Sequence, residues 1–455
     1  MIRNKPATRT MLAAALLGSL WAQGPGAAQG APAEPPRTQP PGPGGFLSLG
    51  QAVETALRAH PLLQEANATL VAANARTEQA RSQYYPQVSA NLDNSYGAGR
   101  INPRFTVGGA LLQPNQSIFV SGVMANQRIY DFGYTQSLVQ SSKLAERAQE
   151  EDLQARRAIV VLNVERAYFT SQKRRRLVQI AEETVRERGV IRSQIEALYR
   201  QQLKSKLDLD LVQVELTNAE ALLVRARNDL KASFADLNRA MGVSGPEDYV
   251  LDDLPVEIRQ PRPLETLIAD SLSHPELKKA KEIVASSEAK VRAMKKQYLP
   301  TISAMASGGS FDPYDPRSTQ EHGGWWAAGA LMSMPLFTGF LIENQVREAA
   351  AQQDAAKATS LNIEQALTQQ VTTSYLETLS LAQQIKLAEE QVRTAKEALQ
   401  LSRQRYKLGL GSVVEVTQSE VAVTAAQMRL AEAQYDYKIA EVTLAYAAGQ
   451  LTGTP

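Results

Sequence analysis

Two copies of one long unit follow each other in the sequence, and this internal repeat restricts the fold more than any other feature. His60-Pro61 recurs as His274-Pro275, 214 residues later. Further matches keep the same order at separations of 214, 206 or 207 residues. They are Tyr84-Tyr85-Pro86 with Tyr298-Leu299-Pro300, Ile129 to Gly133 with Pro335 to Gly339, Ala181-Glu182-Glu183 with Ala388-Glu389-Glu390, Tyr199 with Tyr406, and Met241-Gly242 with Ala448-Gly449. A series in constant order predicts one structural unit built twice.

Each copy predicts a short helix, a second helix, two strands and two long helices. The second helix should end before Pro86 or Pro300, because the residue that precedes proline disfavours helix. The next helical pattern covers roughly 65 residues, or roughly 100 Å, and ends in a turn near Gln201 or Gly409. The predicted segments before the repeats are a signal peptide at 1–33 and a Pro/Gly-rich linker at 34–48. The first repeat covers 49–245, with helices at 49–59 and 61–84 and strands at 87–97 and 117–128, and a connecting segment follows at 246–262. The second repeat covers 263–450, with helices at 263–273 and 275–298 and strands at 301–310 and 325–336, and a tail follows at 451–455.

Alternating polar and apolar residues mark the predicted strands. In the first strand the odd-numbered residues from Gln87 to Ser95 are polar, whereas most even-numbered residues from Val88 to Tyr96 are apolar. Each run has about ten residues, the length of a tilted strand that crosses a membrane. Trp325 and Trp326 begin one strand, which suits an aromatic girdle at a membrane interface. Ordinary soluble hairpins are the alternative for the strands taken alone.

Four strands per chain are too few to close a membrane barrel, and an exposed strand edge is not tolerated in lipid. Spanning barrels begin at about eight strands and use even numbers. Two chains would supply eight strands, which leaves too narrow an interior for a pore, whereas three chains would supply twelve. The predicted fold is therefore mainly α, with a long α-helical coiled-coil tunnel and four β-strands per chain, completed as a 12-strand barrel in a homotrimer.

Apolar residues recur every seven positions in the last long helix of each copy. Heptad spacing indicates packing against a neighbouring helix with supercoiling. A helix of this length exceeds a hydrocarbon layer of about 30 Å several-fold, so most of it is expected in an aqueous space. The heptad positions are Leu216, Leu223, Leu230 and Leu237 with Ala219, Ala226 and Ala240 in the first copy, and Val423, Leu430, Tyr437 and Leu444 with Ala426, Ala433, Ala440 and Ala447 in the second.

The first residues have the pattern of a secretory signal peptide. Arg3, Lys5 and Arg9 give a positive start, Met11 to Trp21 is a short apolar run, and small residues suitable for cleavage follow. This run is too short for a spanning helix, although an N-terminal membrane anchor is the alternative. Elsewhere no stretch reaches the ~18 apolar residues of a transmembrane helix.

Composition excludes several classes of site. Cysteine is absent, which excludes disulfides, thiolate metal sites and a lipid anchor on cysteine. The formal net charge is +2 with acids and bases interspersed, so no basic face suggests nucleic acid. We find no catalytic, cofactor-binding or metal-binding motif, and we interpret His60 and His274 as structural turn residues. An exported enzyme is thus disfavoured, and a periplasmic coiled-coil scaffold would not explain the strands.

These features resemble the outer-membrane efflux protein family, the TolC-like channels, over about 49–449. The resemblance implies a homotrimer in the outer membrane of a Gram-negative bacterium, with one barrel in outer-membrane lipid and a helical tunnel across the periplasm. It also implies a periplasmic adaptor (membrane fusion) protein and an inner-membrane pump or ABC transporter that supplies the energy. The implied function is a passive exit duct of a tripartite export system for small-molecule efflux, with type I protein secretion as the alternative. The most specific matching pieces are Tyr84 to Pro86, Tyr298 to Pro300, Pro335 to Gly339, Arg405 to Gly409 and Val413 to Val416.

The turns between the long helices supply the candidate functional residues. Glu415 follows the second turn, and Asp208 and Asp210 follow the first. Three-fold rings of these acids would attract cations, and their repulsion would favour opening of a gate. Solvated acids at helix starts, where the dipole favours negative charge, are the alternative. The candidates for adaptor contact are Tyr406, Gly409 and Tyr199, with Gly409 alternatively a left-handed helix stop.

Two residues depart from the family pattern. Gln202 stands where the second copy has Gly409, so the two turns are not expected to contact an adaptor alike. Gln418 stands where some relatives have a second acid after the position of Glu415, so a doubled acidic ring is not expected.

Overall fold

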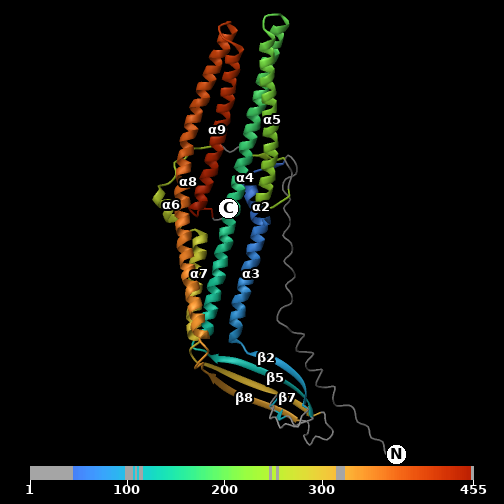
Figure 1. Ribbon diagram of the computed structural model, residues 1–455, viewed down its shortest axis with the longest axis vertical. Coiled ribbons are helices and arrows are strands. Elements are labelled where there is room, and N and C mark those ends of the chain that lie inside the picture. Colours follow the sequence, from blue (N-terminus) through green and yellow to red (C-terminus); the bar gives the residue numbers. More distant parts are fainter. Residues whose placement is uncertain are drawn as a thin grey trace, which may run out of the picture.

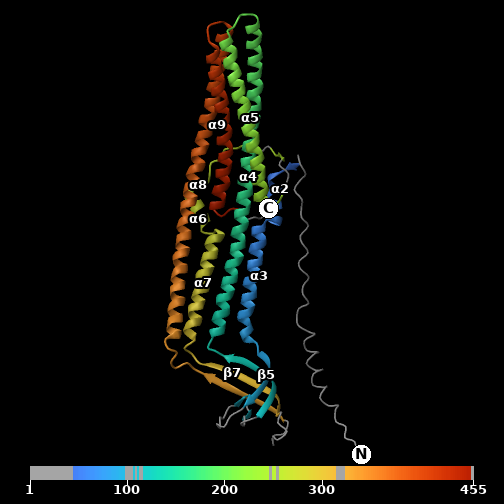
Figure 2. The ribbon, with the colours of Figure 1, turned by 45° about the vertical axis from the view of Figure 1, so that its right-hand side comes forward.

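The molecule is an elongated shaft of long helices with one β-sheet at one end (Figures 1 and 2). The computed structural model describes residues 45–97, 106–107, 110–111, 116–244, 248–252, 256–313 and 323–451. The predicted signal peptide, most of the predicted linker and the end of the predicted tail lie outside these residues. Within the described ranges, no helix is both long and apolar enough to cross a bilayer.

Both copies fold into the same order of elements, and the predicted class, mainly helical with a four-stranded sheet, is confirmed. The first copy contains α2 (Leu49–Ala59), α3 (Pro61–Arg81), the 3-10 helix η1 (Ser82–Tyr84), β2 (Gln87–Gly97), β3 (Thr106–Val107), β4 (Ala110–Leu111), β5 (Gln116–Tyr130), α4 (Tyr134–Arg200) and α5 (Lys206–Met241). The second contains α6 (Leu264–Ser271), α7 (Pro275–Lys296), β7 (Thr301–Pro313), β8 (Gly323–Ser333), α8 (Leu341–Lys407) and α9 (Val413–Ala447). Outside the copies are β1 (Phe46–Leu47) and β6 (Val250–Leu251).

Several element ends differ from the prediction. The strand expected at 325–336 begins at Gly323 and ends at Ser333, which pairs with Thr301 at the end of the ladder. Pro335 has no N–H with which to extend that ladder. The strand expected at 117–128 runs over 116–130 and carries a β-bulge between Arg128 and Tyr130.

The turns that lead from strand to long helix fix the register between the copies. Phe132 and Gly133 have φ values of 54° and 83° and precede α4. Gly339 and Phe340 have φ values of 62° and 65° and precede α8. These equivalent pairs are 207 residues apart, so the predicted pairing of Gly133 with Gly339 at 206 residues is wrong by one position. Each copy holds one phenylalanine in the left-handed region, which bulky residues rarely occupy.

The repeated His-Pro pairs mark joints between helices. Nδ1 of His60 accepts a hydrogen bond from the N–H of Leu62 at 3.1 Å and caps α3, and His274 caps α7 in the same way. Their interpretation as structural turn residues is confirmed. Gly242 caps the end of α5, and a Cβ added to it would lie 2.7 Å from Cα of His60. Gly449, just past α9, approaches His274 similarly. α5 therefore abuts α3 end to end, and α9 abuts α7.

The arrangement leaves the same two edges along the whole molecule. Near the sheet the helices follow the order α3, α4, α7, α8, and in the other half the order α5, α4, α9, α8 (Figures 1 and 2). The strand order is β2, β5, β7, β8, with every neighbouring pair antiparallel. One edge is thus formed by β2, α3 and α5, and the other by β8 and α8.

One face of the sheet is mostly apolar, and the other, which we call the polar face, mixes Ser89 and Ser307 with Met124 and Leu331. Trp326 is 83% exposed and pairs with Gly308, which places it on the apolar face with Val123. Trp325 points to the opposite face, because successive side chains of a strand alternate. Its ring covers Gly122, where an added Cβ would lie 3.1 Å from Cζ2. The two tryptophans thus lie on opposite faces of the sheet, and the prediction that they form a membrane girdle stays a prediction.

A strap crosses the helices near the middle of the shaft; we define it as β1, β6 and residues 256–262. The strands β1 and β6 pair in parallel. The buried Tyr168 hydroxyl of α4 donates to the carbonyl of Leu47 at 3.1 Å and accepts from the N–H of Asp252 at 3.0 Å. The hydroxyl of Tyr437, on α9, makes a similar pair of bonds: it donates to the carbonyl of Arg259 at 2.8 Å and accepts from the N–H of Arg259 at 3.0 Å. The end of the predicted linker is thus part of the folded structure.

The heptad positions are buried to different degrees in the two copies. In α9, Val423 and Tyr437 are 8% and 1% exposed, because α9 lies between α4 and α8. In α5, the equivalent Leu216 and Leu230 are half-buried, because α5 lies at an edge.

Candidate functional site at the hairpin tips

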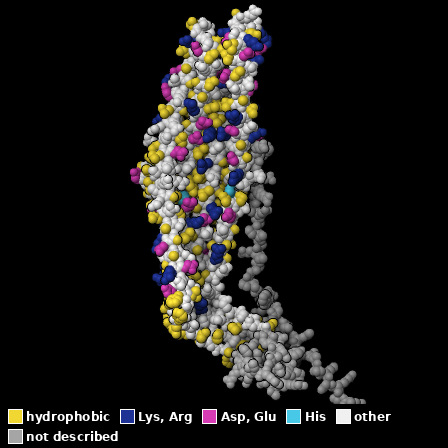
Figure 3. All heavy atoms as spheres, in the orientation of Figure 1, with side chains coloured by type: hydrophobic (Ala, Val, Ile, Leu, Met, Phe, Trp, Pro, Cys, Tyr) yellow, Lys and Arg dark blue, Asp and Glu magenta, His cyan; other side chains and the backbone are white. Residues whose placement is uncertain are grey.

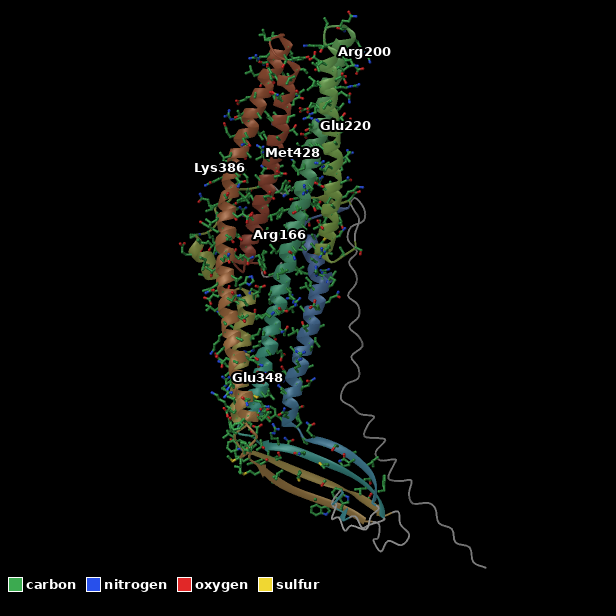
Figure 4. The ribbon with its side chains drawn as sticks, viewed as in Figure 1. Arg166, Arg200, Glu220, Glu348, Lys386 and Met428 are labelled. Atoms are coloured by element: carbon green, nitrogen blue, oxygen red, sulfur yellow. The ribbon has the colours of Figure 1, made fainter. Side chains whose placement is uncertain are left out.

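Both turns between the long helices lie at the end of the shaft farthest from the sheet (Figure 1). Figure 4 labels Arg200, the last residue of α4, at this end. The first tip comprises residues 201–205 between α4 and α5, and the second tip comprises 408–412 between α8 and α9. The structure thus brings all the predicted turn residues to one end of the molecule.

The first tip is closed by a capping box. Ser205 Oγ accepts a hydrogen bond from the N–H of Asp208 at 3.2 Å. One oxygen of the Asp208 carboxylate accepts in return from the N–H and Oγ–H of Ser205, at 3.1 and 2.9 Å. This reciprocal arrangement satisfies orphan donors at the helix start. Asp208 is therefore a capping residue, whereas Asp210 lies exposed two residues further along α5.

The second tip is built differently. Gly409 has a φ of 74°, and the N–H of Leu410 donates to the carbonyl of Arg405 at 2.9 Å. Gly409 is thus the left-handed helix stop that was the alternative interpretation of this residue. Ser412 Oγ accepts from the N–H of Glu415 at 3.3 Å, but the Glu415 carboxylate turns toward Arg405, with Oε2 3.8 Å from Nε. The side chain of Glu415 remains 47% exposed.

Tyr406 joins the two hairpins. Its ring packs against Ile195 and Val413 on one side and against Leu399 and Val416 on the other. Its buried hydroxyl has no hydrogen-bond partner among the residues that the structure describes. Nζ of Lys204, from the first tip, lies 4.3 Å from the ring centroid, which is a cation–π contact. The ring of Tyr406 thus lies between the hairpins, and its predicted contact with an adaptor stays a prediction.

The exposed surface of the tips combines apolar side chains with polar and charged ones such as Gln201, Gln202 and Lys206. Tyr199 and Gly409 are both exposed, as expected for residues that contact a partner. Exposed leucines surround them, and the sequence analysis did not single these out. They are Leu203, Leu207, Leu408 and Leu410.

A charged network lies below the tips and was not predicted. Glu420 of α9 is 5% exposed, and Arg403 of α8 donates to it at 3.0 Å. Arg403 also lies 3.5 Å from Glu187 of α4. Burial raises the pKa of Glu420, and the hydrogen bond from Arg403 opposes that rise. Glu420 lies between Val416 and Val423 on the buried stripe of α9, so a charge within an apolar stripe was the available signal.

Long hairpins that end in a sheet too small to close define a class of channel-forming outer-membrane protein, and the comparisons give its family. The family model described as "Outer membrane efflux protein" matches residues 52–243 and 271–450, one match in each copy. The chain therefore belongs to the outer membrane efflux protein family, and it is an outer-membrane protein of a Gram-negative bacterium.

Named relatives cover most of the chain. Outer membrane protein TolC of Escherichia coli (strain K12) is 25% identical over 434 residues, which is 90% of this chain and 84% of TolC. Outer membrane efflux protein BepC of Brucella suis biovar 1 (strain 1330) is 22% identical over 381 residues, or 82% of this chain and 79% of BepC.

Solved structures share the fold. A crystal structure of CusC has a TM-score of 0.76 at 19% identity and covers 89% of this chain and 93% of its own. The outer-membrane channel OprN has a TM-score of 0.75 at 18% identity and covers 95% and 98%.

Proposed function

We propose that this protein is the passive exit duct of a tripartite export system, working as a homotrimer that spans the outer membrane and projects into the periplasm. Small-molecule efflux is the proposed task, with a periplasmic adaptor protein and an inner-membrane pump or ABC transporter as partners. The names of two relatives, efflux protein BepC and the cation efflux system protein CusC, support efflux over secretion.

The observation that carries this proposal is the pair of continuous edges. β2 and β8 end the four-stranded sheet, and an unpaired strand edge is costly in a bilayer. An edge of β2, α3 and α5 that meets an edge of β8 and α8 on the next copy makes a head-to-tail contact, which closes into a ring at a suitable rotation. Three copies supply twelve strands and a channel wide enough for solutes.

Cysteine pairs across the edges test the ring, because the sequence has no cysteine of its own. Ser89→Cys on β2 is combined in turn with Ala327→Cys, Gly329→Cys or Leu331→Cys on β8, all on the polar face. Oxidation should produce a covalent trimer for at least one pair. Asn126→Cys with Ala327→Cys is the matched control, because β5 is paired on both sides within its own chain. Monomers alone in every edge pair would contradict the ring.

The proposed gate is at the tips. Glu415 is the first candidate, because its carboxylate is exposed and is not held by a capping box. Asp208 and Asp210 are the further candidates on the first hairpin. The exposed surface with Tyr199, Gly409 and the leucines fits the apolar side chains of an adaptor.

A deletion strain separates efflux from secretion. Loss of the duct should raise sensitivity to drugs or metals while secreted proteins remain at normal levels. Loss of one secreted protein, with unchanged sensitivity, would favour the alternative of type I secretion.

A further inference from the structure

A cavity of about 570 Å³ lies in the half of the shaft that carries the sheet. All four helices of that half line it: α3 contributes Leu62, α4 contributes Asp152 and Ile159, α7 contributes Lys279, and α8 contributes Ile363. Its volume is in the range of small-molecule sites in proteins. Figure 3 shows hydrophobic and charged side chains interspersed along one face of the shaft, and the cavity combines both kinds.

The cavity and the strap lie on different faces of α4. Tyr168 binds the strap, and Asp152, sixteen residues earlier, lines the cavity. At 3.6 residues per turn, sixteen residues correspond to a rotation of about 160°. In the proposed ring the straps would obstruct the channel if they lay inside. The cavity therefore belongs to the inner wall of the duct, an assignment that rests on the proposed function.

Two cations converge on one carboxylate in this cavity. Asp152 is buried, and its two oxygens accept from Nζ of Lys279 at 2.7 Å and from Nε of Arg156 at 2.8 Å. Asp152 is the single hydrogen-bond partner of Lys279 among the described residues, so two of its three N–H groups have no protein acceptor. Nη1 of Arg156 lies 3.7 Å from Oε1 of Glu65, and this is the one ion pair of its terminal nitrogens within the described residues.

Apolar surface remains open beside these cations. Leu62 and Ile283 line the cavity and are 37% and 41% exposed, with Ile159 and Ile363 nearby. Glu276 also lines the cavity, and together with Glu65 it opposes the entry of anions. A small inorganic anion would thus gain little binding free energy here. An anion with an apolar body would gain the hydrogen bonds to the cations and also the burial of its apolar surface.

We propose that this cavity is a binding site in the duct wall for amphipathic organic anions. The acid group lies on Lys279 and Arg156, which Asp152 holds side by side, and the apolar body covers Leu62, Ile159 and Ile283. Anions of this class would pause here on their way along the duct.

Fluorescence titration of the purified full-length protein tests the site with two probes. 8-Anilinonaphthalene-1-sulfonate carries an anionic sulfonate, and N-phenyl-1-naphthylamine has the same ring system without it. The variants are Lys279→Met, which removes one cation while Arg156 still pairs with Asp152, and Ile283→Trp, which fills the cavity. Lys281→Met on an exposed position of α7 is the control, and all samples are compared in the same detergent.

The anionic probe should bind wild type and Lys281→Met alike, and Lys279→Met should weaken it about tenfold, the effect of one charge-assisted hydrogen bond. The neutral probe should bind wild type more weakly and be insensitive to Lys279→Met, and Ile283→Trp should abolish both. Equal wild-type affinity for the two probes, or unchanged anion binding in Lys279→Met, would overturn the site. The mass of the same samples reports the trimer separately, so failure of the site and failure of the ring are distinguishable.

Discussion

The α4–α5 and α8–α9 hairpins differ in how their second helix is covered and in how their tip is closed. α9 lies inside the layer with its heptad residues buried, whereas α5 lies at an edge with several of them half-buried. The first tip holds Asp208 in a capping box, whereas Glu415 of the second tip is free of one. The same repeated unit thus places its last helix at an edge in the first copy and between two other helices in the second. The acid at its tip is held in a capping box in the first copy and is not held in one in the second.

The largest expected difference concerns the two heptad stripes. Val423→Asp places a charge at a buried position of α9, which should destabilise the protein by about 3 kcal/mol or more. Leu216→Asp, at the equivalent half-buried position of α5, should cost about 1 kcal/mol in the isolated chain. Thermal melting of both variants checks this order. Equal losses would mean that α5 is as deeply buried in the assembled protein as α9.

A half-buried acid on α4, Glu165, should make stability depend on pH. Burial raises the pKa of Glu165 to about 7, and its counterpart 207 residues later is the uncharged Thr372. The folded chain then holds the proton more tightly than the unfolded chain, where the pKa is about 4.3. The contribution of this tighter proton binding to the free energy of unfolding is complete below about pH 4.3 and is lost as pH rises through 7.

Glu165→Gln should therefore flatten the pH dependence and leave the variant about 3 kcal/mol more stable relative to wild type at pH 8 than at pH 4. Melting temperatures measured from pH 4 to pH 8 give the comparison. Parallel curves for wild type and variant would show that Glu165 ionises normally.

The acids of the two tips should separate stability from conductance. Asp208→Asn weakens a capping box and should lower stability by about 1 kcal/mol. Glu415→Gln should leave melting unchanged but reduce cation preference and block by divalent or trivalent cations in single-channel recordings, because three exposed carboxylates at the axis of the proposed trimer would attract cations. If Glu415→Gln conducts like wild type, Glu415 is an ordinary acid at a helix start, and the gate lies elsewhere.

The smallest effects concern the left-handed residues of the tips. Gln202 has a φ of 63° in the position that Gly409 occupies in the second tip. Gln202→Gly should raise stability by about 0.5 kcal/mol because it relieves the strain of a side chain at positive φ, less the entropy that glycine loses. Gly409→Ala should lower it by about 1 kcal/mol. Changes of opposite sign in the melting temperatures of the two variants would support equivalent left-handed positions for Gln202 and Gly409. Changes of the same sign would contradict that equivalence.

Much of the fold could be predicted because the repeat supplied two independent readings of each element. Strand alternation placed β2 and β7, and the His-Pro pairs placed the starts of α3 and α7. The same alternation, applied to Trp325 and Trp326, would have assigned them to opposite faces. The pairing of Gly133 with Gly339 failed because a glycine occupies different positions of two equivalent left-handed turns.

The candidate site was less predictable because it depends on contacts between distant segments. The order of residues around the second turn suggested an exposed Tyr406, but its ring packs across to the first hairpin. The link from Arg403 to Glu187 and Glu420 joins three helices. The strap depends on β1 and β6, two-residue strands 204 positions apart, which are too short to leave a pattern.

The joints at His60 and His274 determine how the shaft can deform. α4 and α8 are unbroken rods, whereas the rods beside them are divided where α5 abuts α3 and α9 abuts α7. Each divided rod packs against a continuous helix that supports it, and the strap binds across the helices near the level of the joints. Torsion applied at the tips can therefore turn α5 and α9 about these joints while α3, α7 and the sheet stay in place. A twist applied at the tips would therefore deform the middle of the shaft and leave the sheet undistorted.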